Sequence, residues 1–175
     1  MKKMISASLV AFSLLISTAS FAAMPKSADT VAAPMNVDKG SFVKVVTSAN
    51  AFEIESSKLA EEKARDVDVK DFAKQMIADH TKAAEGLKKA AKLGDEPPVL
   101  APKHQAMLDT LKGASGEDFQ ALYIEMQASA HMDAVTLFAT YAKGGDDAAV
   151  KQFAAETLPK LEMHKMHVMK LVAAH

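Results

Sequence analysis

Apolar residues recur every three or four positions in four long stretches of this chain, and this spacing constrains the fold more than any other feature of the sequence. Such spacing gives a helix one apolar face, which the helix has to bury against another element. The stretches cover about residues 39–64, 68–93, 115–143 and 146–173. No segment alternates apolar and polar residues as a half-buried strand would. The sequence therefore predicts an all-α protein.

Residues that start and stop helices support these boundaries. Asp38, Ser115 and Asp146 precede helical stretches and are suited to cap a helix N-terminus. Glycine, which often ends a helix, follows at Gly94 and at Gly144. The turns between the first two helices and between the last two are short, so each pair is expected to form an antiparallel hairpin.

The connection from residue 94 to residue 116 is the longest one and contains Pro97, Pro98 and Pro102. We expect a short helix within it, from Lys103 to Leu111. A connection of this length can travel along a bundle of about 35 Å, since a helix rises about 1.5 Å per residue. Two antiparallel hairpins joined by a long crossover that contains a short helix make a ferritin-like four-helix bundle, which is the predicted fold.

The first residues have the pattern of a signal peptide. Lys2 and Lys3 precede an apolar run, and Ser20 and Ala22 are small residues at the positions that a signal peptidase reads. We expect residues 1–22 to be removed by a cut between Ala22 and Ala23. Residues 23–38 are then a flexible leader, and residues 39–175 form the bundle domain. The predicted location is the periplasm or the outside of the cell.

Composition excludes several classes of protein. The chain has no cysteine, which excludes both a lipid-anchored lipoprotein and a disulfide framework. Its net charge is −1 and it lacks a basic run, so nucleic acid is not an expected partner. No second apolar stretch is long enough to span a bilayer, and we expect no transmembrane segment in the mature chain.

Three histidines, His80, His131 and His164, fall within the apolar stripes, and Glu53 lies at the edge of the first stripe. Counting from the first turn puts Glu53 and His80 at nearly the same height, and the crossover brings His131 to that level. The same count leaves His164 about 9 Å away. Carboxylates and imidazoles that converge inside a bundle can bind a metal ion, so these four residues are the predicted ligands of iron, zinc or copper.

An alternative interpretation of the histidines stays open. A di-iron oxidase site needs Glu-x-x-His pairs, but Ile77, Ala128 and Leu161 stand three positions before the histidines. A histidine on an apolar face can instead be a core-edge side chain that is hydrogen-bonded to a neighbour such as Glu53, Asp79 or Tyr123. Converging ring nitrogens would favour the metal site, and separately paired rings would favour the alternative.

Methionines near the C-terminus provide a second candidate site. Met163, Met166 and Met169 alternate with His164 and His167, and thioether and imidazole ligands suit copper. Methionine is also a common filler of irregular cores, so the same pattern can reflect packing. His104, in the crossover, is predicted to be a surface residue.

Several spaced segments resemble a known family. These are the stretch from Phe72 to His80, then Phe119 with Tyr123 and His131, and finally Phe153-Ala154 with Leu158-Pro159 and His164. Together they resemble the domain of unknown function 4142 family over about residues 41–173. Members are exported bacterial proteins, often labelled predicted outer-membrane proteins, with a ferritin-like fold. The resemblance implies that His80, His131, His164 and an acidic residue at Glu53 or Glu55 occupy the family's recurring polar positions.

Two functions follow from these observations. The first is a non-enzymatic binding or stress-related role in the cell envelope, because the chain lacks a complete catalytic set. The alternative is a metal-binding ferritin-like protein with a Glu/His cluster inside the bundle.

Overall fold

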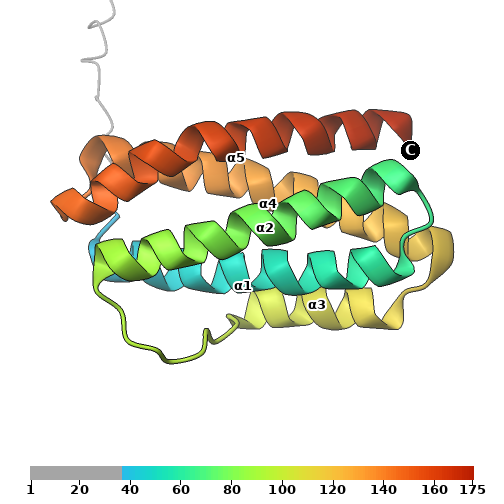
Figure 1. Cartoon of the computed structure of the whole chain (residues 1–175), viewed down its shortest axis with the longest axis horizontal. Coiled ribbons are helices and arrows are strands. Elements are labelled where there is room, and N and C mark those ends of the chain that lie inside the picture. Colours follow the sequence, from blue (N-terminus) through green and yellow to red (C-terminus); the bar gives the residue numbers. More distant parts are fainter. Residues whose placement is uncertain (1–36) are drawn as a thin grey trace, which may run out of the picture. The chain divides into compact units, whose positions relative to one another are not determined.

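The computed structural model describes residues 37–175, and within that range the chain forms five α-helices and no strand (Figure 1). The all-α prediction is confirmed. The predicted signal peptide and nearly all of the predicted leader lie outside the described residues. The helices are α1 (Lys39–Lys63), α2 (Val67–Ala91), α3 (Pro102–Gly113), α4 (Gly116–Gly144) and α5 (Ala148–Ala174).

The helices pair as two antiparallel hairpins, α1 with α2 and α4 with α5. The hairpins pack on each other through α2 with α5 and through α1 with α4. The crossover returns along α1 as the short helix α3, so α2 and α4 run in the same direction (Figure 1). This is the predicted arrangement of two hairpins and a crossover. None of the described helices is both long enough and apolar enough to cross a membrane.

The interior contains two apolar cores that are separated by a layer of buried polar groups. One core includes Phe52, Met76 and Tyr123, and the other includes Phe42 and Leu87. Between these cores, or at the edge of the first one, lie buried polar residues from four helices. They are Asn50 and Glu53 on α1, His80 on α2, Gln127 and His131 on α4, and His164 on α5. The cores therefore hold the helices together on both sides of a polar layer near the middle of the bundle.

Aspartates cap three of the helices. Asp38 accepts a hydrogen bond from the Ser41 amide, and Asp66 accepts from the amides of Asp68 and Val69. Asp38 is the cap that the sequence predicts.

Two of the predicted helix starts need correction. Ser115 precedes α4 but its side chain makes no capping hydrogen bond. The cap of α5 is Asp147 and not Asp146, because the Asp146 carboxylate accepts from the Tyr141 hydroxyl instead (2.9 Å). The α5 helix therefore begins slightly later than predicted.

The end of α2 also differs from the prediction. The helix stops at Ala91, before Gly94, because Lys92 adopts a left-handed backbone conformation with φ 56°. The Leu93 amide then donates to the Lys88 carbonyl (3.0 Å), which satisfies a carbonyl that the helix end leaves free. A residue with a Cβ is strained in this conformation, whereas glycine is not.

Replacing Lys92 with glycine is expected to stabilise the fold. Lys92 is exposed, so the substitution removes backbone strain without removing a buried contact. We expect Lys92→Gly to raise the free energy of unfolding by about 0.5–1 kcal/mol in urea denaturation. The matched control is Lys89→Gly, within the helix, which should lower it by about as much. Equal losses in both variants would contradict the analysis of this helix end.

Candidate metal centre

The structure brings His80, His131 and His164 together in the polar layer. They project from α2, α4 and α5, and their ring centroids lie 5.4–5.6 Å apart. One ring nitrogen from each lies within 4.8 Å of the corresponding nitrogens of the other two. All three side chains are buried, with no more than 5% of any residue exposed. The three histidines form a compact, enclosed cluster.

Each histidine is anchored through one of its two ring nitrogens. His131 Nδ1 donates to the backbone carbonyl of Gln127 (2.9 Å), and His164 Nε2 donates to the Asp79 carboxylate (2.9 Å). His80 Nδ1 lies 2.8 Å from Asn50 Oδ1. Because these three oxygens accept hydrogen bonds, the anchored nitrogens carry the ring protons in the neutral imidazoles.

The other nitrogen of each ring has no hydrogen-bond partner. These atoms are His80 Nε2, His131 Nε2 and His164 Nδ1, and all of them are shielded from solvent. With the proton held on the anchored side, each of these nitrogens presents a lone pair. A buried acceptor without a partner is unfavourable, and a metal ion that accepted these lone pairs would remove that cost.

Burial keeps the histidines neutral. Loss of hydration lowers the pKa of His80 well below its usual value, and the neighbouring His131 and His164 lower it further. The same loss of hydration lowers the pKa of His131 to about 4. Burial also lowers the pKa of His164, although the hydrogen bond to Asp79 opposes the shift. Neutral imidazole is the form that binds metal ions.

Asp79 supports the cluster from its edge. Burial opposes its ionisation, but the hydrogen bond from His164 and the charge of Lys160, 3.4 Å away, hold its pKa below the usual value. The carboxylate is therefore ionised at neutral pH and fixes the orientation of the His164 ring. A carboxylate in this position also makes an imidazole a stronger metal ligand.

Glu53, the fourth predicted ligand, is not brought into the group of converging nitrogens. It is buried with 3% of its surface exposed, and its Oε2 atom has no hydrogen-bond partner. Burial raises the pKa of Glu53 to about 8, although the Gln127 side chain opposes the shift. Its carboxyl is consequently neutral near pH 7. The structure places it in the same polar layer, without a ligand contact to the histidines.

The predicted height of His164 is wrong. Its ring centroid lies 5.4 Å from that of His131, whereas the residue count separates the two by about 9 Å. The later start of α5 removes part of the discrepancy. In addition, helical side chains lean toward the N-terminus of their own helix, so in an antiparallel pair these two side chains lean toward each other.

Sequence reasoning missed Asn50 and Gln127. Asn50 holds His80, and the Gln127 side chain donates to the Ser56 hydroxyl (3.1 Å) in the same layer. Both are polar residues in the interior of long helices, and Asn50 lies one helical turn before Glu53. That position could have identified it as a neighbour of the histidines.

The arrangement is compatible with one transition metal ion. Imidazole nitrogens bind zinc at about 2.0–2.1 Å, which places tetrahedral ligand atoms about 3.3 Å apart. The three nitrogens here, within 4.8 Å of one another, would have to move closer together, by small rotations of rings that are each tethered at one atom.

In the methionine-rich segment near the C-terminus, the methionines and His164 differ in burial. Met163, Met166 and Met169 are partly exposed, while His164 points into the core. His167 packs edge-on against Phe72, with ring centroids 5.0 Å apart. The methionines on this face therefore do not fill the core.

His104 is not the free surface residue that the sequence predicts. It lies in α3, half-buried, with its Nδ1 2.6 Å from the Ser48 hydroxyl. Its ring stacks on Phe52 with centroids 5.5 Å apart. The histidine thereby fastens the crossover helix to α1.

Comparison with known protein families shows which family the chain belongs to. The sequence profile named "Domain of unknown function (DUF4142)" matches residues 24–171. The chain belongs to this family. The match covers α1 to α4 in full and α5 as far as Leu171, and it includes the three histidines. No curated protein matches the chain.

Two solved structures share the fold of this DUF4142 protein. The "DUF305 fragment from Deinococcus radiodurans" has a TM-score of 0.65 and 12% identity, over 77% of this chain and 94% of that one. "CopM in the Cu(II)-bound form" has a TM-score of 0.64 and 17% identity, over 78% of this chain and 97% of that one. At such low identity the similarity shows the fold alone.

The buried polar layer predicts how the stability of the metal-free protein depends on pH. The folded-state pKa of each histidine lies below its unfolded value of about 6.5, so the unfolded chain binds more protons and stability is lost as the pH falls below that value. Glu53 has the opposite effect, because its pKa rises from 4.5 to about 8 on folding and stability falls as the pH rises through that interval.

Glu53→Gln isolates the carboxyl contribution. Between pH 6.5 and 8 we expect the unfolding free energy of the wild-type protein to fall relative to that of the variant by up to about 1.4 kcal/mol per pH unit, because the histidines contribute equally in both proteins. Urea denaturation at several pH values in the presence of a chelator measures both. The exposed Glu55→Gln is the matched control and should keep the wild-type slope. Equal slopes in all three proteins would show that Glu53 ionises normally.

Proposed function

We propose that this DUF4142 protein is an exported helical protein that binds one transition metal ion, zinc or copper, through His80, His131 and His164. The observation that carries the proposal is that the two nitrogens of each histidine ring differ in their hydrogen bonding. One nitrogen of each histidine is anchored and the other has no partner, and one nitrogen from each ring lies within 4.8 Å of those of the other two inside the bundle. A core histidine that only satisfies its own hydrogen bonds does not require this convergence.

The donor set favours zinc or copper over iron. Three imidazoles suit zinc and copper, and the chain has no cysteine that could supply a thiolate. Non-haem iron sites usually include a carboxylate, and Glu53 is not among the converging ligands. The shared fold with a protein solved in a Cu(II)-bound form supports including copper among the first metals to test.

Enclosure of the site favours binding over turnover. Three protein ligands leave at least one coordination position for another ligand, as in catalytic zinc sites. Here, however, the surrounding side chains shield all three free nitrogens from solvent. We infer that the protein retains or carries its ion. This preserves the binding role in the envelope that the sequence favours, and a role in stress stays a prediction.

The proposal that the protein is exported rests on its N-terminal sequence. The signal-peptide pattern of residues 1–22 supports a periplasmic location and a mature chain that begins at Ala23. Fractionation of bacterial cells, followed by mass spectrometry of the intact protein, tests both. A cytoplasmic protein that retains residues 1–22 would refute this part of the proposal.

Metal titration tests the histidine site. Isothermal titration of the untagged protein with Zn²⁺ and with Cu²⁺ should give one tight site for at least one of the ions. His80→Ala, His131→Ala and His164→Ala should each weaken that site by about 100-fold or more, because each variant removes a ligand. Elemental analysis of protein purified from periplasm should find the same ion.

The control for these variants is His175→Ala, because His175 lies at the exposed end of α5, outside the cluster. This variant should bind with wild-type affinity. Circular dichroism checks that each variant remains helical. Tight binding that survives all three substitutions in the cluster would place the metal elsewhere and refute the proposal.

Asp79→Asn tests the anchoring of His164. The asparagine keeps the shape of the side chain but removes the charge that orients the ring and strengthens it as a ligand. We expect affinity to fall by about 10- to 100-fold with one site per chain retained. Asp71→Asn, at an exposed position of the same helix, is the matched control and should leave affinity unchanged. Unchanged affinity in Asp79→Asn would show that His164 does not need its carboxylate partner.

A further inference from the structure

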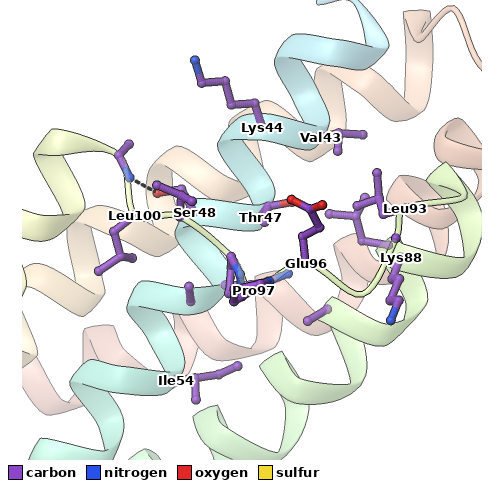
Figure 2. A pocket seen from close by; sticks show the side chains of 18 of the residues that line it. Val43, Lys44, Thr47, Ser48, Ile54, Lys88, Leu93, Glu96, Pro97 and Leu100 are labelled. Atoms are coloured by element: carbon purple, nitrogen blue, oxygen red, sulfur yellow. Dashed lines mark hydrogen bonds between the residues drawn. The ribbon is translucent and has the colours of Figure 1, made fainter.

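The bundle has a cavity outside the three-histidine cluster. Its volume is about 710 Å³, and it lies between α1, α2 and the crossover segment of residues 93–102 (Figure 2). Ligand-binding pockets commonly have volumes of about 300–1,000 Å³. The crossover segment is held over the cavity because the Ala101 amide donates to the Ser48 hydroxyl oxygen (2.7 Å). The cavity is therefore large enough for a small molecule and has a fixed wall.

The wall of this cavity is mainly apolar. Apolar side chains come from all three elements, among them Val43 and Ile54 on α1, Leu87 on α2, and Leu93, Pro97 and Leu100 on the crossover. An apolar molecule of matching size would remove this surface from water, which is the main source of favourable free energy in such pockets.

The charged groups around the cavity balance one another. Lys44 and Lys88 are matched in number by Glu85 and Glu96, and all four are exposed. Lys88 also forms an ion pair with Asp95. The rim therefore favours neither an anionic nor a cationic ligand, and a neutral molecule fits it best.

One buried polar side chain lines the cavity with an unused hydrogen-bond donor. Asn50 is 6% exposed, and its Oδ1 atom is occupied by His80. Its Nδ2 atom has no partner and is shielded from solvent, so a ligand reaches it only after a small shift of the surrounding side chains. Ser48, the neighbouring buried polar residue, is already bonded to Ala101 and His104. A ligand that carries a hydrogen-bond acceptor would satisfy Asn50 Nδ2, and a buried donor otherwise left unpaired is unfavourable.

We propose that this cavity binds a neutral, largely apolar small molecule through a carbonyl group that accepts a hydrogen bond from Asn50 Nδ2. Asn50 would then hold the ligand with one atom of its amide and the His80 ring with the other. The binding site adjoins the proposed metal centre but does not require a metal ion to be bound.

A fluorescent naphthyl ketone, 6-propionyl-2-dimethylaminonaphthalene, provides a direct test. It is neutral, apolar and carries one carbonyl group, and its emission reports both polarity and hydrogen bonding. When the ketone is titrated into the mature protein, which begins at Ala23, it should bind at one site per chain, and its emission should shift to the blue. The carbonyl-free parent, 2-dimethylaminonaphthalene, should bind several-fold more weakly. Absence of saturable binding by the ketone would overturn the proposal.

Two variants locate the site. Ala84→Trp fills part of the cavity and should weaken ketone binding by about tenfold or more, because Ala84 lines the wall. The matched control is Ala121→Trp, which changes an exposed alanine at a separate surface pocket between α4 and α5. It should leave binding unchanged. Loss of binding in Ala121→Trp with wild-type binding in Ala84→Trp would place the probe in the other pocket and overturn the proposal.

Asn50→Asp tests the hydrogen bond. Aspartate keeps an oxygen for His80 but removes the free donor, so ketone affinity should fall by about three- to tenfold while affinity for the carbonyl-free parent stays unchanged. An equal effect on both compounds, or no effect on either, would remove Asn50 from the recognition of the ligand. Circular dichroism and thermal melting confirm that each variant is folded.

The outcome is separable from that of the metal proposal, because the ketone titrations are done in chelator and then repeated after metal loading. Ketone binding by a protein that binds no metal would support the cavity and refute the metal centre. Metal binding without ketone binding would do the reverse.

Discussion

Three imidazoles are buried between two apolar cores, and the polar groups of the interior are arranged around them. Loss of hydration keeps the rings neutral, and the apolar residues on either side leave few groups that can satisfy them. Each ring therefore depends on a single anchor supplied by Asn50, by the Gln127 backbone or by Asp79. These anchors decide which nitrogen of each ring faces inward, and so decide whether the cluster can bind an ion.

Without a metal ion, the polar layer lowers the stability of the folded protein. Other parts of the fold have to compensate for this loss. The inward nitrogens and the Glu53 carboxyl oxygen are buried without partners, and each such group destabilises the folded state by about 1–3 kcal/mol. The apolar cores on either side of the layer compensate, with aromatic contacts such as Phe42 on Tyr141 (ring centroids 4.1 Å apart). Binding of an ion would satisfy the nitrogens, which links metal affinity to folding stability.

The comparisons with solved structures concern the fold and not the function. Helical bundles with 12% and 17% identity superpose on most of this chain, which shows how weakly the fold depends on individual residues. Function depends on the side chains placed inside the fold. In this DUF4142 protein we propose that those are the polar residues of the middle layer and the residues that line the cavity between α1, α2 and the crossover, with Asn50 common to both.

The helices, their pairing and the identity of the three buried histidines could be predicted from the residues alone, because periodic burial of apolar residues is a local property of the chain. The sequence did not determine that Lys92 ends α2, that Asp147 caps α5 or that His104 fastens the crossover, since each depends on contacts formed by distant residues or on the precise path of the backbone. Tertiary structure alone decided that His164 joins the cluster and that Glu53 stays outside it. Those outcomes depend on helix register and on the lean of side chains across antiparallel helices, and residue counting along one chain captures neither.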